Sequence, residues 1–147
     1  MYTEIVAFLR MLKPDDGDKF LMMLGGWLGF WFSFAVGGVD KMIIWLAILA
    51  VVDYITGIIA AFRGCKWCSS VGFKGIAKKA AMFAIVAFCH GLDQTTGLGM
   101  FRNMAIFAYA VNEAGSIIEN IDASGWGKFI PAFLRNGLKQ IQDKHKI

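Results

Sequence analysis

The residues of this chain that could do chemistry are acids set inside apolar segments. Asp53 lies near the middle of the apolar run that follows Lys41, and Glu113 lies in a later apolar run. An acid at mid-membrane costs about 2.5–3.5 kcal/mol on insertion scales, so a compensating group is expected. For Asp53 the candidates are an ion pair with Arg102 or Lys79, a protonated neutral state, or water in an assembled pore. The two acids either line a pore or hold the helices together as structural hydrogen-bonding partners.

Cysteine and histidine offer a weaker signal. Cys65 and Cys68 form a single CxxC pair, and only Cys89 and His90 lie nearby in sequence, in another expected helix. A zinc site needs about four ligands, and a redox CxxC is expected in a βαβ context, so free thiols are the favoured interpretation. The sequence has no Ser/His/Asp arrangement, phosphate loop or carboxylate pair at hydrolytic spacing. We therefore expect no enzyme, no metal and no cofactor.

The composition is that of an integral membrane protein. Hydrophobic residues make up 57% of the 147 residues, against about 45–50% in soluble domains, and they are clustered in runs. The formal net charge of +4 is explained by loop charges that fix topology, so no nucleic-acid partner is expected. An acidic turn precedes the first apolar run, in place of a basic region with a cleavage site after it, which predicts insertion without a cleaved signal. The length suits one membrane domain over residues 1–147.

The hydropathy pattern predicts an all-α protein with four transmembrane helices, at about residues 20–39, 42–62, 76–92 and 98–118. A short interfacial helix is expected over residues 3–13. A tail over residues 119–147 follows, in which Pro131 opens a basic amphipathic segment.

Basic residues predict the orientation of these helices. With four spans, all of the fifteen Lys and Arg except Lys41 and Arg102 lie on one side of the membrane. The positive-inside rule then places both termini in the cytoplasm, which makes this a multi-pass protein of the cytoplasmic membrane. The middle loop carries five of these topology-setting residues: Arg63, Lys66, Lys74, Lys78 and Lys79.

Helical periodicity groups the other candidates. Several polar side chains of the helix at 98–118 fall within about a third of its circumference, and Thr56 lies near Asp53 at helical spacing. The buried polar or pore-lining candidates are Asp53, Thr56, Arg102, Tyr109, Asn112, Glu113 and Ser116. Small residues at helical spacing predict close helix packing. They are Gly25, Gly29, Ser33, Gly37, Gly57, Ala80 and Ala84.

Three sequence blocks follow one another in order: DYITGIIAAF (53–62), SSVGFKGIAKK (69–79) and NEAGSIIENIDASG (112–125), with Pro131 after them. Together they resemble the toxin-secretion/phage-lysis holin family over about residues 40–140. The resemblance implies a phage-encoded protein that oligomerises in the host cytoplasmic membrane. It also implies timed lesions through which a cytoplasmic endolysin reaches the cell wall; some relatives export large toxins. The expected partners are further copies of the chain, the lipid bilayer and, functionally, an endolysin.

Other functions fit the residues alone. One is a small four-helix transporter or ion channel, with Asp53 and Glu113 as a proton or cation relay. Another is a membrane anchor whose basic tail recruits a soluble partner. Met11 follows Met1 closely, and a second start there would give a shorter partner form or antiholin, although eight methionines make coincidence the favoured explanation.

Overall fold

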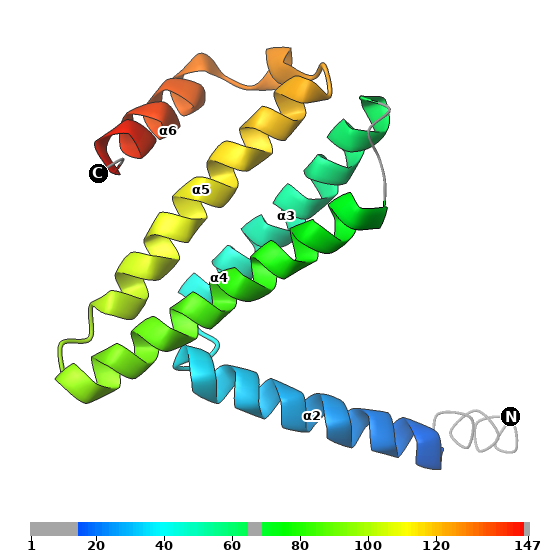
Figure 1. Cartoon of the computed structure of the whole chain (residues 1–147), viewed down its shortest axis with the longest axis vertical. Helices are drawn as coiled ribbons and strands as arrows, with labels where there is room; N and C mark the ends of the chain where they lie inside the picture. The colour runs from blue at the N-terminus through cyan, green and yellow to red at the C-terminus, as the bar shows by residue number, and fades with distance from the viewer. Residues whose placement is uncertain (1–14, 65–68, 146–147) are drawn as a thin grey trace, which may run out of the picture. The chain divides into compact units, whose positions relative to one another are not determined.

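The computed structural model describes residues 15–64 and 69–145, and most of these residues are helical (Figure 1). The elements are α2 (Asp16–Val36), α3 (Lys41–Arg63), α4 (Ser69–Thr96), α5 (Phe101–Ala123), the 3₁₀ helix η1 (Gly127–Phe129) and α6 (Ala132–His145). No strand occurs in the two described ranges, in agreement with the predicted all-α class. The expected interfacial helix at 3–13, the CxxC pair and Lys66 lie outside the described residues.

The chain divides into two compact units, Met1–Phe34 and Ala35–Ile147. The first unit contains most of α2, in which Trp31 packs edge-to-face against Trp27, with ring centroids 6.0 Å apart. The second unit contains α3 to α6 and the last residues of α2. One membrane domain over the whole chain stays a prediction.

Three helices are long and apolar enough to cross a membrane: Asp16–Val36, Lys41–Arg63 and Gly72–Thr96. They correspond to the first three predicted spans, and α4 extends the third of these at both ends. The helix α5 is as long as α3, at 23 residues, but its Arg, Asn and Glu side chains lower its hydropathy. A fourth span and the orientation of the helices therefore stay predictions.

The turn between α2 and α3 is built on two glycines. Gly37 and Gly38 have φ of 79° and 99°, a conformation that ends a helix at little steric cost only with glycine. Gly37 was expected inside the first span and instead follows α2. A Cβ at Gly37 would lie 2.5 Å from Nδ1 of His90, so this turn and α4 meet at a point where only a glycine fits.

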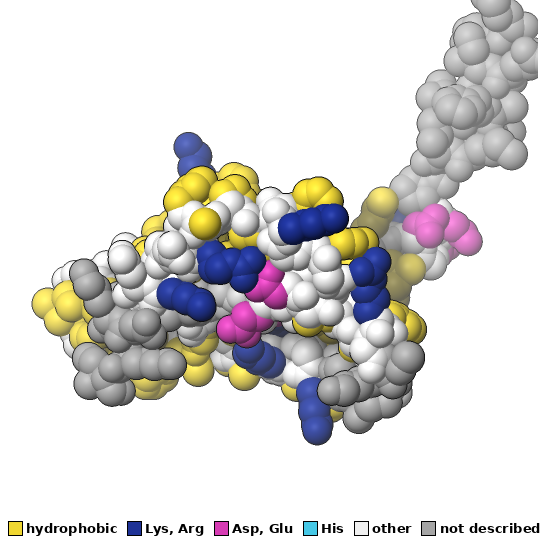
Figure 2. Space-filling model, turned by 90° about the horizontal axis from the view of Figure 1, so that it is seen from above, with side chains coloured by type: hydrophobic (Ala, Val, Ile, Leu, Met, Phe, Trp, Pro, Cys, Tyr) yellow, Lys and Arg dark blue, Asp and Glu magenta, His cyan; other side chains and the backbone are white. Residues whose placement is uncertain are grey.

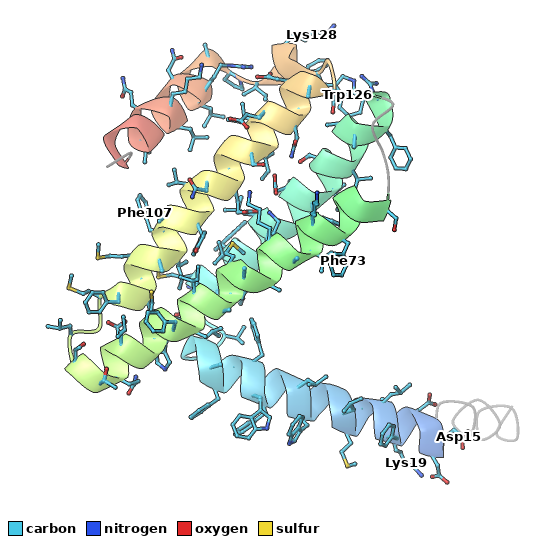
Figure 3. The ribbon with its side chains drawn as sticks, in the orientation of Figure 1. Asp15, Lys19, Phe73, Phe107, Trp126 and Lys128 are labelled. Carbon is cyan, nitrogen blue, oxygen red and sulfur yellow. The ribbon has the colours of Figure 1, made fainter. Side chains whose placement is uncertain are left out.

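In the second unit, α5 packs against both α3 and α4, and α6 packs against α5 (Figure 1). The core side of α3 carries Ile43, Leu46 and Ala50 at helical spacing, and Asp53 continues the same side. Large hydrophobic side chains such as Phe73 and Phe107 point away from these helices (Figure 3). An exposed apolar exterior around a buried polar position is the pattern expected in a bilayer.

Arg102 holds together the end of this unit where α3 and α5 begin. Its guanidinium donates to Oδ2 of Asp40 at 2.9 Å, to the carbonyl oxygen of Gly38 at 3.2 Å, and to the carbonyl oxygen of Val36. Arg102 is 8% exposed. It therefore satisfies the carbonyl groups that the turn leaves free, and it is not the partner of Asp53.

Two carboxylates cap helices at the same end. Asp40 accepts a hydrogen bond from the backbone N–H of Ile43 at 3.0 Å, as an N-cap residue does. Asp93 of α4 accepts from the backbone N–H groups of Phe101 and Arg102, at 2.9 and 2.8 Å. Asp93 thus caps a helix other than its own, which fixes the start of α5 against the end of α4.

The two roles of Asp40 can be separated. Asp40→Asn keeps a capping side chain, whereas Asp40→Ala removes both the cap and the pair with Arg102. We expect Asp40→Ala to be less stable than Asp40→Asn by about 1 kcal/mol in denaturant unfolding in mild detergent.

The contribution of the charge on Asp40 can be tested by changing the pH. The hydrogen bond from Arg102 holds the pKa of Asp40 below its ordinary value. The charge on Asp40 therefore stabilises the folded protein when the pH is above the ordinary pKa of about 4. This stabilisation is lost as the pH falls through the lowered pKa. The stability difference between wild type and Asp40→Asn should shrink in acid; a difference independent of pH would contradict a role for the charge.

Candidate functional site

Lys79 joins three helices through one ammonium group. From α4 it donates to a carboxylate oxygen of Asp53 on α3 and to one of Glu113 on α5. The three side chains are 14%, 10% and 3% exposed, in the order Lys79, Asp53 and Glu113. Of the compensating groups considered for Asp53, the structure shows the pair with Lys79. We call Asp53, Lys79 and Glu113 the charged triad.

The triad lies at one level of the bundle. Asp53 is ten residues before the end of α3, Lys79 is ten residues after the start of α4, and Glu113 is ten residues before the end of α5. At 1.5 Å per residue, each is about 15 Å from the same end of the unit. Two carboxylates and one ammonium leave the triad with one excess negative charge when all three groups are ionised.

Asn120 is a fourth member of the site that sequence reasoning missed. Its Nδ2 donates to Oδ1 of Asp53 at 3.0 Å and to Oγ1 of Thr56 at 3.3 Å. It was missed because the fourth helix was expected to end at residue 118, whereas α5 continues to Ala123. The available signal was spacing, since Asn120 is seven residues after Glu113 and so lies on the same side of the helix.

Two cavities flank the triad. The first, of about 270 Å³, is lined by Asp53, Lys79, Ser116 and Asn120 together with Tyr54, Gly57, Ile58, Gly72, Gly75 and Lys78. The second, of about 390 Å³, lies between α4 and α5 and is lined by Tyr109, Asn112, Glu113, Ser116 and Glu119 with Lys78, Ala81, Met82 and Ile85. The structure therefore brings most of the predicted polar candidates together, with Arg102 apart from them.

The small residues that were predicted to form a packing face lie in different environments. A Cβ at Gly57 would lie 3.4 Å from Nδ2 of Asn120, so Gly57 allows the close approach of α5. Ala80 and Ala84 are exposed. Gly25, Gly29 and Ser33 lie in α2. The predicted packing face stays a prediction.

Basic side chains gather at the end of the unit nearest the triad, with acidic side chains among them (Figure 2). Arg63, at the end of α3, donates to the carbonyl oxygen of Ser124. Lys74 and Lys78 are exposed, but Lys79, which was counted among the loop charges, is inside the bundle. Among the described residues, no group of His, Cys, Asp and Glu could hold a metal ion.

Comparison with known proteins gives one family and several relatives. The model of the bacteriophage holin family matches residues 30–143. An uncharacterized protein of Clostridium perfringens (strain 13 / Type A) is 36% identical over 82% of this chain and 89% of its own length. An uncharacterized protein of Listeria monocytogenes is 39% identical over 76% of this chain and 80% of its own length. No solved structure matches the chain.

Removal of the shared ammonium should destabilise the bundle strongly. Lys79→Met leaves two buried carboxylates without their cation. Removal of one partner of a buried ion pair lowers the free energy of unfolding by about 3–5 kcal/mol. Denaturant unfolding in mild detergent measures the loss. Lys78→Met, at the exposed neighbouring position, is the matched control and should change stability by about 0.5 kcal/mol or less.

A compensated variant distinguishes charge from packing. Lys79→Met combined with Asp53→Asn and Glu113→Gln leaves no unpaired charge, so it should recover most of the lost stability. Equal stability of Lys79→Met and Lys78→Met would show that the triad does not hold the helices together.

Proposed function

Because the chain belongs to the bacteriophage holin family, we propose that it oligomerises in the host cytoplasmic membrane and opens timed lesions there. An endolysin, or a large toxin-like cargo, leaves the cytoplasm through these lesions. In this proposal α5 is the fourth span and both termini are cytoplasmic. The family is one of non-enzymatic membrane pore proteins, and the proposal assigns the chain no catalytic step.

The observation that carries the proposal is the polar cavity between α4 and α5. Its walls include Asn112 and Glu119, which are exposed, and Tyr109 and Ser116, which are half-buried. In hydrocarbon, exposed polar groups at this level need water or protein partners. A single subunit leaves this cavity open to its surroundings, whereas an assembly can cover it with another subunit or turn it toward water.

The charged triad supports two functional states of the same chain. In the structure, Lys79 pairs with both carboxylates and offsets one of their two negative charges, which lowers the cost of keeping a subunit in the bilayer. The excess negative charge next to the cavity favours water or a cation over lipid. The charged triad, which is paired inside a single subunit, would therefore also favour an assembly in which water fills the cavity.

Lysis with a separate endolysin tests the function directly. The chain is expressed in bacteria with a cytoplasmic endolysin that lacks a signal sequence, and culture density and membrane potential are followed together. We expect a delay and then abrupt lysis that requires both proteins. Loss of potential without endolysin release would favour the ion-channel function, and no effect despite verified insertion would contradict the holin function.

The triad should also set the time of lysis. Asp53→Asn and Glu113→Gln each change the charge balance around Lys79, so both should shift the onset of lysis in the same assay. Lysis time is compared at equal amounts of membrane-inserted protein, with Lys74→Gln, at an exposed position that lines neither cavity, as the control. Unchanged timing in both carboxylate variants would count against a role of the triad in opening.

Thiol accessibility tests which side of α5 meets water in the lesion. Asn112→Cys and Phe107→Cys are made in a protein whose three cysteines are serine; the two positions are about 140° apart around the helix. Phe107 points away from α3 and α4 (Figure 3). A charged, membrane-impermeant thiol reagent should label position 112 several-fold faster after lesions open, and position 107 equally slowly before and after. Equal labelling of both positions would contradict a lesion lined by the cavity.

A further inference from the structure

The helix α6 has an apolar side that the rest of the unit covers only in part. Phe133, Leu134, Leu138 and Ile141 lie on one arc of the helix, and Arg135, Asn136, Lys139 and Gln140 lie on the opposite arc. Leu138 and Ile141 are half-buried, whereas Phe133 and Leu134 are 72% and 46% exposed. The exposed part of the apolar arc therefore has no cover within the described part of the chain.

The segment before α6 extends this surface. Phe129 is 74% exposed and Trp126 is 44% exposed. A cation lies over each ring: the Arg63 guanidinium carbon is 4.5 Å from the Trp126 ring centre, and Nζ of Lys128 is 5.4 Å from that of Phe129. Figure 3 shows Trp126 and Lys128 at the turn that follows α5. An aromatic ring beside a cation suits the boundary between acyl chains and headgroups.

Contacts within the unit fix the position of this surface. Arg63 of α3 donates to the carbonyl oxygen of Ser124, so the turn is tied to the end of α3. Arg135 of α6 forms a bidentate pair with Asp122 of α5 and donates to the carbonyl oxygen of Gly127 at 3.3 Å. The surface therefore sits at the end of a helix, α3, that is apolar enough to cross a membrane.

The charge of the segment selects one kind of membrane surface. Between Trp126 and Ile141 the sequence contains Lys128, Arg135 and Lys139 and no Asp or Glu. Each Lys or Arg near a membrane surface raises the affinity for acidic lipids by about fivefold. We propose that η1 and α6 form a binding surface for acidic phospholipid headgroups, with Phe129, Phe133 and Leu134 in the acyl-chain boundary. This inference requires insertion of the helices in a bilayer, but it does not require lesions.

Site-specific fluorescence in the full chain tests the surface. A polarity-sensitive nitrobenzoxadiazole label is placed on Leu134→Cys or on Asn136→Cys, in the protein whose own cysteines are serine. The two positions are about 160° apart around α6, which makes position 136 the matched control. The protein is reconstituted in vesicles of phosphatidylcholine with increasing amounts of phosphatidylglycerol. We expect a blue shift and protection from aqueous iodide at position 134 that grow with phosphatidylglycerol, and little change at position 136.

Charge variants and dilution complete the test. Lys128→Gln with Lys139→Gln should lower the ratio of docked to undocked label by about fivefold for each lysine removed. Arg135 is left intact because it holds α6 against α5. Equal, water-like emission at both positions in every vesicle would overturn the proposal. Protection that does not depend on the amount of phosphatidylglycerol would also overturn it, because the partner would then be uncharged lipid. Protection that disappears as protein is diluted with lipid would overturn it too, because the partner would then be a second copy of the chain. None of these readouts depends on lysis, so the surface and the holin function can fail separately.

Discussion

The ammonium group of Lys79 is the interaction on which the arrangement of α3, α4 and α5 depends. An ionised group removed from water carries a penalty of several kcal/mol unless a partner and further hydrogen bonds compensate it. Lys79 compensates Asp53 and Glu113 at once, so the three helices are constrained to one relative height. A shift of any helix by one turn, about 5.4 Å, would separate at least one carboxylate from the cation. The register of the bundle is therefore set by charge, while its cohesion comes from the apolar core around Leu46, Val86 and Ile106.

The same constraint explains which features the sequence could predict. Asp53 and Glu113 were expected to need a partner because charge in an apolar run is costly, and the expected helix around Asp53, residues 42–62, agrees closely with α3. The sequence could not decide whether Arg102 or Lys79 is the partner of Asp53, because this depends on the height of each residue along the bundle. Arg102 is the second residue of α5 and lies at the far end with Asp40, whereas Lys79 lies a further ten residues into a helix that begins at Ser69.

For a related reason, the hydropathy pattern could not predict two other features of the site. Lys79 was counted as a loop charge because a basic residue near the end of an apolar run is expected to reach toward water. Asn120 was left out because hydropathy places a helix end where polar residues begin, and α5 continues through several of them. In both cases the missing information was the position of a helix end. A polar residue that is satisfied by a neighbouring helix leaves no signal in a property averaged along its own helix.

The two ends of the unit are held by contacts of different strength. At one end, Arg102 is 8% exposed and bonds the turn after α2, and Asp93 caps α5 from α4. At the other end, the Arg135–Asp122 pair is about one-third exposed on each side, and exposed pairs contribute about 0–1 kcal/mol. Separation of α6 from α5 at the basic end therefore costs less than separation of the helices at the capped end. In the proposed lesion, α6 would separate from α5 first, while the charged triad and the capped end keep α3, α4 and α5 of one subunit together.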